Sequence, residues 1–361
     1  MVDFNQSHKV DFNQPHKRDF TMKSDNLQIL SDKSEFGKER PWVMRKSESL
    51  AVARAFYSLG ESKLSDKISD CGSYLEFQSC SAVPDHHRRL KNAYFCRDRS
   101  CVMCQWRKSL KVQTQLFGVV DCHLSQKGNT SDVPLLLTLT IPNCEGSDLK
   151  SRLDLINLAW DKMTRRAFFR PVKASFKALE ITYNREKNTY HPHIHCLLIV
   201  GSRYFDRNKS DYINHESWTN RWREATGLDV NGAGIDIRRV RKKKGHSLAS
   251  IIAEVAKYSV KPSSFIHHGS NGIVALPNVL NVIRDATFRK RIYSFGRNFA
   301  KIHRYLNLKD PNDSDLISAG EEDLSESKCP KCSSELCDER YHWHLKMRNY
   351  YKKIVEIEKS A

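Results

Sequence analysis

Three histidines occur at every second position at the start of an apolar run, HPHIHCLLIV (191–200). Alternate residues of a β-strand face the same side, so the three rings would share one face of a sheet. Pro192 has no backbone N–H to donate to a ladder, which places His191 in the loop entering the strand. His193 and His195 remain inside the strand, and two imidazoles at this spacing favour a metal site over polar residues on a solvated face.

A third ligand is available in the preceding segment, FKALEITYN (176–184), which is also predicted to be a strand. Glu180 is a carboxylate in an otherwise apolar strand, and burying it is costly unless it has a partner. A hairpin between the two strands would bring it to His193 and His195. Two imidazoles and one carboxylate leave coordination positions open, which is typical of a catalytic metal site rather than a structural one.

A nucleophile is available in the segment SLASIIAEVAKYSV (247–260), which is predicted to be a helix ended by Pro262. Glu254 and Tyr258 are four residues apart and would lie on one helix face. A tyrosine hydroxyl held near a metal-polarised electrophile can attack it covalently, and a glutamate beside it can act as general base. On helix spacing alone, a Tyr258 packed in the core is the better interpretation.

The cysteines suggest a separate, structural metal site. Cys96, Cys101 and Cys104 have the spacing Cys-x4-Cys-x2-Cys, and either Cys80 or Cys71 would complete a tetrahedral zinc site. Free buried thiols are the alternative. Eleven cysteines in a chain expected to stay in the cytosol favour metal binding over disulfides.

A second cysteine cluster lies near the C-terminus. It consists of Cys329-x2-Cys332 with Cys337, and His342 or His344 would be the fourth ligand. The residue types allow a zinc site and a tail of exposed thiols equally.

The charge of the chain indicates its partner. Lys and Arg exceed Asp and Glu by enough to give a formal net charge of +18 over 361 residues, which favours nucleic acid over a merely solvated basic surface. A basic run suited to phosphate contacts comprises Arg238, Arg239, Arg241, Lys242, Lys243 and Lys244. There is no apolar run long enough for a membrane span and no secretory signal, so a cytoplasmic protein is expected.

The order of predicted elements indicates an α+β fold with a central antiparallel sheet flanked by helices, preceded by a zinc-binding module. The catalytic domain is expected at 130–307, after a cysteine-rich module at 68–120. The other expected parts are a flexible polar N-terminal tail over 1–67, an acidic linker over 308–327 and a small basic Cys/His tail over 328–361.

Four of these stretches resemble motifs of one superfamily, and they occur in its order. HPHIHCLL (191–198) resembles the His-hydrophobe-His motif of the HUH endonucleases, LLLTLTIPN (135–143) the strand motif before it, and EVAKYSVKPSS (254–264) the tyrosine motif. FCRDRSCVMCQWRKSLK (95–111) resembles an upstream signature. Together they resemble the rolling-circle replication initiators of small bacterial plasmids, in the subgroup with one tyrosine plus a glutamate. Because CGSYLEF also resembles this family, Cys71 is favoured over Cys80 as the fourth zinc ligand.

The resemblance implies a mechanism. Tyr258 would attack a DNA phosphate at the plasmid origin, remain linked to the 5′ phosphate and release a 3′ hydroxyl that primes synthesis. His193 and His195 would hold Mg²⁺ or Mn²⁺, with Glu180 as the inferred third ligand. Lys261 would contact the scissile phosphate, and Glu254 would activate a water to terminate replication. The implied partners are single-stranded or hairpin origin DNA and a host helicase and polymerase in a bacterial cytoplasm.

Two other readings of the motifs remain. A related HUH transposase or relaxase would use the same chemistry, although relaxases carry an N-terminal tyrosine and here Tyr258 follows the histidines. A non-catalytic, zinc-dependent DNA-binding regulator would explain the cysteines and the charge. It would leave Glu180, the histidine strand and the Glu254/Tyr258 face unexplained.

Overall fold

The computed structural model describes most of the chain. The described residues are 28–34, 37–86, 88–206, 212–230, 234–240, 252–253, 255–256, 261–310, 312, 315–318 and 328–352. Within them the chain is a mixed α+β protein whose paired strands are all antiparallel. The predicted α+β class, an antiparallel sheet flanked by helices, is therefore confirmed. No helix in this part of the chain is both long enough and apolar enough to cross a membrane.

The larger sheet has five strands in the order β6-β3-β5-β4-β9. Their bounds are β3 (Val133–Thr140), β4 (Val172–Asn184), β5 (Thr189–Val200), β6 (Asp236–Arg239) and β9 (Tyr293–Arg297). β5 lies at the centre, and its last five residues, Cys196–Val200, are fully buried. A strand that packs on both faces is expected to be continuously apolar, which explains the CLLIV run after the histidines.

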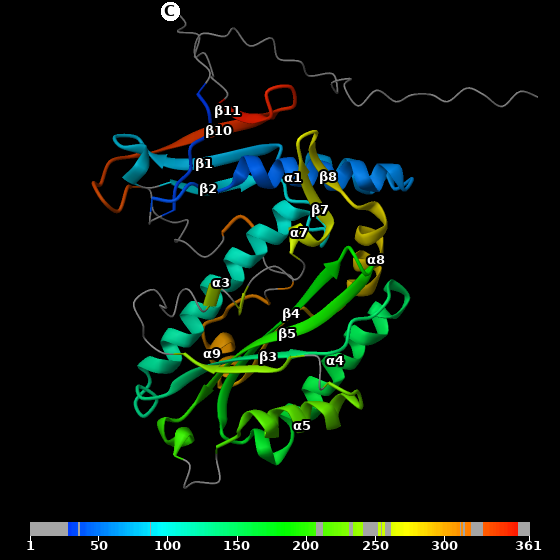
Figure 1. Ribbon diagram of the computed structural model, residues 1–361. Helices are drawn as coiled ribbons and strands as arrows, with labels where there is room; N and C mark the ends of the chain where they lie inside the picture. Colours follow the sequence, from blue (N-terminus) through cyan, green and yellow to red (C-terminus); the bar gives the residue numbers. More distant parts are fainter. Residues whose placement is uncertain are drawn as a thin grey trace, which may run out of the picture.

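Helices cover both faces of this sheet (Figure 1). On one face lies α4 (Leu149–Thr164), where Asn157 accepts a 2.6 Å hydrogen bond from Lys177 of β4. On the other face lies α9 (Asn298–Tyr305), whose His303 packs 4.5 Å from the ring of Phe295. Phe295 in turn contacts Phe176 of β4, which shares a face with Glu180 by strand alternation.

Next to α4 is α5 (His215–Thr226), which carries two tryptophans on its inner face. Trp218 and Trp222 are both fully buried, and the indole of Trp222 donates to the carbonyl of Thr140 at 2.7 Å. The two rings therefore pack in the core, as their i,i+4 spacing on an amphipathic helix indicates, and neither is available for stacking on DNA bases.

A second sheet pairs two strands between residues 74 and 93 with two strands between residues 336 and 352. It has four strands in the order β11-β10-β1-β2, namely β1 (Tyr74–Cys80), β2 (Arg88–Ala93), β10 (Leu336–His344) and β11 (Asn349–Lys352). Figure 1 shows the red C-terminal pair lying beside the cyan β1. The separate Cys/His tail predicted over 328–361 is therefore wrong: up to residue 352 it completes a sheet begun near residue 74.

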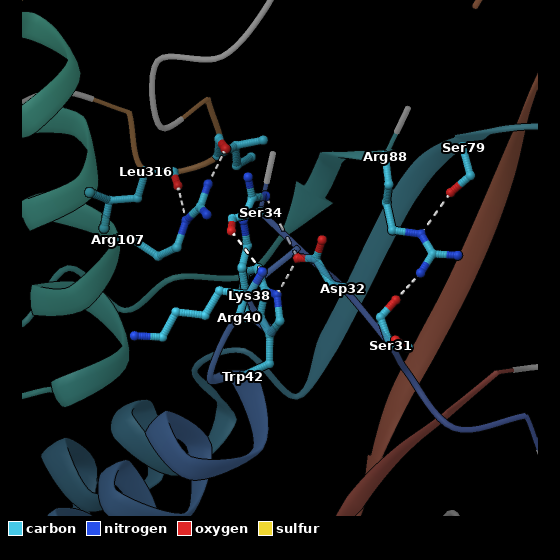
Figure 2. Close-up of polar contacts among 11 residues, drawn as sticks. Ser31, Asp32, Ser34, Lys38, Arg40, Trp42, Ser79, Arg88, Arg107 and Leu316 are labelled. Atoms are coloured by element: carbon cyan, nitrogen blue, oxygen red, sulfur yellow. Dashed lines mark hydrogen bonds and ion pairs between the residues drawn. The ribbon is translucent and has the colours of Figure 1, made fainter. Parts of the chain in front are cut away.

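The flexible tail predicted over 1–67 is also wrong for its second half; residues 1–27 lie outside the described residues. Two helices, α1 (Trp42–Ser58) and α2 (Ser62–Asp70), occupy this stretch. Val52 and Phe56 of α1 are fully buried. Trp42, the first residue of α1, donates to the buried carboxylate of Asp32 at 2.6 Å, as Figure 2 shows.

The expected linker over 308–327 is partly packed against the body of the protein. Arg107 lies on α3 (Val102–Ser125), which in Figure 1 runs from the four-stranded sheet towards the five-stranded one. Its guanidinium donates to the carbonyls of Leu316 and Ile317 at 2.9 and 2.5 Å, the first of which is drawn in Figure 2. These bonds fix the described residues 315–318 to α3.

Four further elements lie between β6 and β9 in the sequence and connect the larger sheet to α1. They are α7 (Pro262–Phe265), β7 (Ile266–Gly269), β8 (Gly272–Ala275) and α8 (Pro277–Thr287). β7 and β8 form a hairpin that contacts α1. α7 begins at Pro262, one residue after Lys261, and packs on β4. This contact brings Lys261 to the larger sheet.

Candidate metal centre

The register of three central strands places the predicted ligands together. His193 of β5 lies opposite Glu180 of β4 on one side and Thr140 of β3 on the other. His195 lies two residues further along β5, opposite Thr138 of β3. Because side chains alternate with a period of two, Glu180, His193 and His195 all lie on one face of the sheet.

The ligand atoms of these three side chains meet. Nε2 of His195 lies 2.9 Å from Oε2 of Glu180, and Nε2 of His193 lies 3.4 Å from the same oxygen. The donor atoms are all within 4.8 Å of one another, close enough to hold one metal ion. Two nitrogens and one carboxylate leave coordination positions for a substrate oxygen, as an open site requires.

The outer nitrogens of both rings are held by the strands themselves. Nδ1 of His193 donates to the backbone carbonyl of His191 at 3.2 Å, which directs Nε2 towards Glu180. Nδ1 of His195 lies 3.1 Å from the hydroxyl of Thr138. Partners of this kind fix the orientation of metal-binding histidines. Thr138 was not singled out from the sequence, although its alternation in LTLT places it on the histidine face.

The carboxylate is buried but ionised. Glu180 is only 2% exposed. Burial alone would raise the pKa of Glu180, but the hydrogen bonds and charges of His193 and His195 outweigh burial and hold that pKa well below its usual range. The ammonium of Lys261 adds an ion pair at 3.0 Å to the other oxygen, Oε1. Lys261 was expected to contact DNA, and its pairing with Glu180 is a feature that sequence reasoning missed.

The place predicted for His191 is wrong. It lies inside β5, paired with Thr182, because Pro192 is accommodated opposite Ile181 rather than ending the strand. The imidazole stacks on that of His193 at 5.0 Å and stays outside the ligand group. Burial, and then repulsion by His193, lower the pKa of His191, so its neutral form is favoured.

Four cysteines form a second ligand group in the other half of the molecule. Cys71, Cys96, Cys101 and Cys104 are all buried, and their sulfurs lie within 4.8 Å of one another. Sγ of Cys104 lies 3.5 Å from that of Cys71 and 3.6 Å from that of Cys96. Four thiolates around zinc at about 2.3 Å would be separated by about 3.8 Å, so this group could hold a metal with little adjustment.

A buried cation accompanies the four cysteines. Lys46 of α1 is fully buried, and its ammonium donates to the carbonyls of Ser69 and Cys71 and to the hydroxyl of Ser73 at 2.5 to 2.8 Å. Burial lowers the pKa of Lys46 to about 8, and negative thiolates at Cys71 and Cys101 would oppose that shift. A metal with four thiolates carries net negative charge, which a buried ammonium would partly balance.

The predicted C-terminal ligand set is not assembled. Cys337 lies on β10 opposite Ser79 and is exposed, and the ring of His342 lies 5.2 Å from that of Tyr74. His344 contacts the ring of Tyr351. Cys329 and Cys332 instead lie beside two residues at and after the end of β1, Cys80 and His86.

The remaining site predictions fall largely where the structure gives no description. Tyr258 and Glu254 lie outside the described residues, as do the basic residues Arg241, Lys242, Lys243 and Lys244. Arg238 and Arg239 are on β6. Arg238 pairs with Asp236 at 2.6 Å with its side chain 59% exposed, and the guanidinium of Arg239 lies 4.5 Å from the ring of Phe205.

Fold and site together define a basic α+β protein with an open Glu–His–His group on an antiparallel sheet. Residues 87–351 match the model of the family described as Replication protein. The chain is 32% identical over 330 residues to "Protein rep" of Streptococcus pneumoniae serotype 2 (strain D39 / NCTC 7466), covering 90% of this chain and 96% of that one. It is 30% identical to "Protein rep" of Bacillus amyloliquefaciens, covering 91% and 98%. No solved structure is significantly similar to this chain.

The chain therefore belongs to the Replication protein family. Membership confirms the resemblance to plasmid replication initiators that the four sequence motifs carry.

Proposed function

We propose that this chain starts rolling-circle replication of a plasmid by nicking one strand of its origin and remaining attached to the 5′ end through Tyr258. The observation that carries the proposal is the convergence of His193 and His195 on Glu180, beside Lys261. A structural metal site would be closed, whereas this group offers three donors and open positions. Family membership favours replication over the transposase, relaxase and regulator alternatives.

Each residue would have a defined part in the cleavage. The hydroxyl oxygen of Tyr258 attacks the phosphorus of the scissile phosphodiester, a P–O bond to tyrosine forms, and the bond to O3′ breaks. The tyrosine proton is transferred in the course of the reaction to the leaving O3′, which becomes a free 3′ hydroxyl. A Mg²⁺ or Mn²⁺ ion held by Glu180, His193 and His195 would polarise the scissile phosphate and neutralise charge that develops there. At termination, Glu254 takes a proton from the water that makes the second cleavage.

The spacing between Lys261 and Tyr258 supports this assignment. They are three positions apart in the sequence, and three residues of chain span at most about 11 Å. Lys261 contacts Glu180 directly. A tyrosine so close in sequence to a residue of the ligand group is therefore within reach of a phosphate bound there. This proximity in sequence supports the proposed HUH-type nicking mechanism.

The four-cysteine group has a structural role in this proposal. Four thiolates with no open position favour Zn²⁺. Cys104 lies in the first turn of α3, Cys101 directly precedes the helix and Cys96 lies in the loop before it. Cys71 follows α2. Zinc bound to them would fix α2 and the loop before α3 to one another.

Replacing Glu180 is expected to remove metal-dependent activity. A Glu180→Gln variant keeps the shape of the side chain but loses the charge that attracts the ion. Removing a residue that only hydrogen-bonds to a metal ligand weakens metal sites by about 10–100-fold. Removing the charge of a ligand itself should therefore lower Mn²⁺ affinity by at least about 100-fold. Isothermal titration with Mn²⁺ measures this, with plasmid nicking alongside. The control is Glu224→Gln, an exposed carboxylate paired with Arg221 on α5. Unchanged Mn²⁺ affinity in Glu180→Gln would contradict the ligand assignment.

Removing the basic run is expected to change the salt dependence of DNA binding. Each phosphate contact contributes about 0.7 to the slope of log K against log salt for single-stranded DNA. Replacing Lys242, Lys243 and Lys244 by alanine should therefore make this negative slope shallower by up to about 2. Fluorescence anisotropy over a salt series measures it. The matched control replaces three exposed lysines elsewhere, Lys63, Lys67 and Lys301. Equal slopes for the two triple variants would argue against the basic run as a phosphate contact.

A further inference from the structure

A third group of metal-ligand side chains lies at the edge of the four-stranded sheet, apart from the candidate active site and the four-cysteine group. Cys80 is the last residue of β1, and His86 ends the short helix η2 (Pro84–His86) that follows it. Cys329 and Cys332 come from the turn before β10. The ligand atoms of all four lie within 4.8 Å of one another.

The turn that carries two of these cysteines is closed by its own backbone. The N–H of Cys329 donates to the carbonyl of Ser334, and the N–H of Ser333 donates to the carbonyl of Cys329, both at 2.8 Å. Ser333 has the left-handed backbone angle φ of 57°, which the tight reversal requires. A closed Cys-x2-Cys turn of this kind presents both sulfurs to the same side, as zinc knuckles do.

The strand pairing brings the other two ligands to this turn. Cys80 lies opposite Leu336 in the β1–β10 register, and the N–H of Ser81 donates to the carbonyl of Glu335 at 3.0 Å. Sγ of Cys80 is thereby held 3.5 Å from Sγ of Cys332. The N–H of Val83 donates to the Cys80 sulfur at 3.4 Å, which helps to hold that sulfur beside the turn.

Burial and hydrogen bonding also point to a bound ion. Cys80 and Cys329 are only 1% and 2% exposed, so both residues are buried. Within the described part of the chain, Nδ1 of His86 is buried and has no hydrogen-bond partner. A metal ion coordinated through this nitrogen would supply the missing partner.

We propose that Cys80, His86, Cys329 and Cys332 form a second structural zinc site, which fastens the C-terminal strands β10 and β11 to β1. Three thiolates and one imidazole are a complete tetrahedral set for Zn²⁺. The four ligands come from two segments that are far apart in the sequence, 80–86 and 329–332. A bound ion would therefore close the long loop of chain between them. This inference stands apart from the proposed nicking activity and from the occupancy of the four-cysteine group.

Zinc content of the full chain tests the site. Cys332 is exposed, so Cys332→Ser should fold, and it is expected to hold one zinc fewer per chain than wild type by elemental analysis after dialysis. The control is Cys337→Ser, an exposed cysteine in the same segment that lies outside the ligand group. It should hold as much zinc as wild type. Because the comparison is a difference between variants, the result does not depend on how much zinc the four-cysteine group holds.

Three outcomes would overturn the proposal. The first is equal zinc in Cys332→Ser and wild type, and the second is an equal loss in Cys337→Ser. The third is a Cys80–Cys332 disulfide in peptide maps of the unreduced protein. If the ion fastens β10 and β11 to β1, amide hydrogen exchange over these two strands should be faster in Cys332→Ser than in Cys337→Ser. Unchanged protection there would refute that role.

Discussion

A Tyr258→Phe variant is expected to lose nicking of a supercoiled plasmid carrying its cognate origin by at least about 1000-fold, because no other group can replace the nucleophile that forms the covalent link. The variant lacks one oxygen atom and should still bind origin DNA. The measurement is conversion of supercoiled to open-circular plasmid in the presence of Mn²⁺, followed on denaturing gels to detect attached protein.

The control for this prediction is another tyrosine. Tyr305 at the end of α9 is 79% exposed, and Tyr305→Phe should nick and attach as wild type does. A Glu254→Ala variant separates the two roles in the tyrosine motif, because it should still nick but fail to terminate. Attachment to DNA by Tyr258→Phe at the wild-type level would contradict the assignment of Tyr258 as the nucleophile. Normal termination by Glu254→Ala would contradict the role proposed for Glu254.

Loss of the four-cysteine group is expected to destabilise the protein severely. Structural zinc supplies about 10–16 kcal/mol of binding free energy in small zinc peptides. If only about 4 kcal/mol of this acts on the fold, the melting temperature of Cys101→Ser should fall by on the order of 10 °C. Cys101 is fully buried at the start of α3, and a serine there would weaken the site and bury a hydroxyl. Thermal unfolding by circular dichroism, with zinc content, measures both effects.

The control for the zinc prediction lies on the same helix. Cys122 is half-buried on α3 and belongs to none of the ligand groups among the described residues. Cys122→Ser should melt within a few degrees of wild type and keep its zinc. If Cys101→Ser and Cys122→Ser have the same melting temperature and the same zinc content, the four cysteines are a packed core cluster without a metal.

The local periodicity of the sequence predicted the three central strands of the larger sheet, β3, β4 and β5, but not the edge strand β9. In β3, β4 and β5, alternating or continuous apolar residues reflect burial directly, and an antiparallel hairpin fixes which residues face each other. The position of Glu180 opposite His193 follows from that register. Pro192 misled the prediction for His191, because the general preference of proline for strand ends was given too much weight.

The N-terminal error has a different cause. α1 buries Lys46, Glu48 and Ser49 together with its apolar side chains, so the helix has no clean apolar stripe. The polar side chains are tolerated because partners far away in the sequence satisfy them, for example the carbonyls of Ser69 and Cys71 for Lys46. Such tertiary compensation leaves no periodic signal, and the segment therefore looked like a polar tail.

The C-terminal ligand set could not be predicted for a related reason. Spacing identified Cys329 and Cys332, but the other ligands depend on the pairing of β10 with β1, which lie more than 250 residues apart in sequence. In that register Cys337 points away from the turn, while Cys80 lies beside it. Non-local strand pairing is decided by the whole fold and is not visible in any local window.

The most direct test of the central claim is to identify the residue that carries the DNA after nicking. Trypsin should release Tyr258–Arg284 as one peptide, because Lys261 precedes proline, and Tyr258 is its only tyrosine. After nicking with Mn²⁺ and nuclease digestion, mass spectrometry should find a nucleotide 5′-phosphate on Tyr258, and none when Glu180 is replaced by glutamine. A nucleotide on any other residue, or nicked plasmid with no protein attached, would contradict the proposed mechanism.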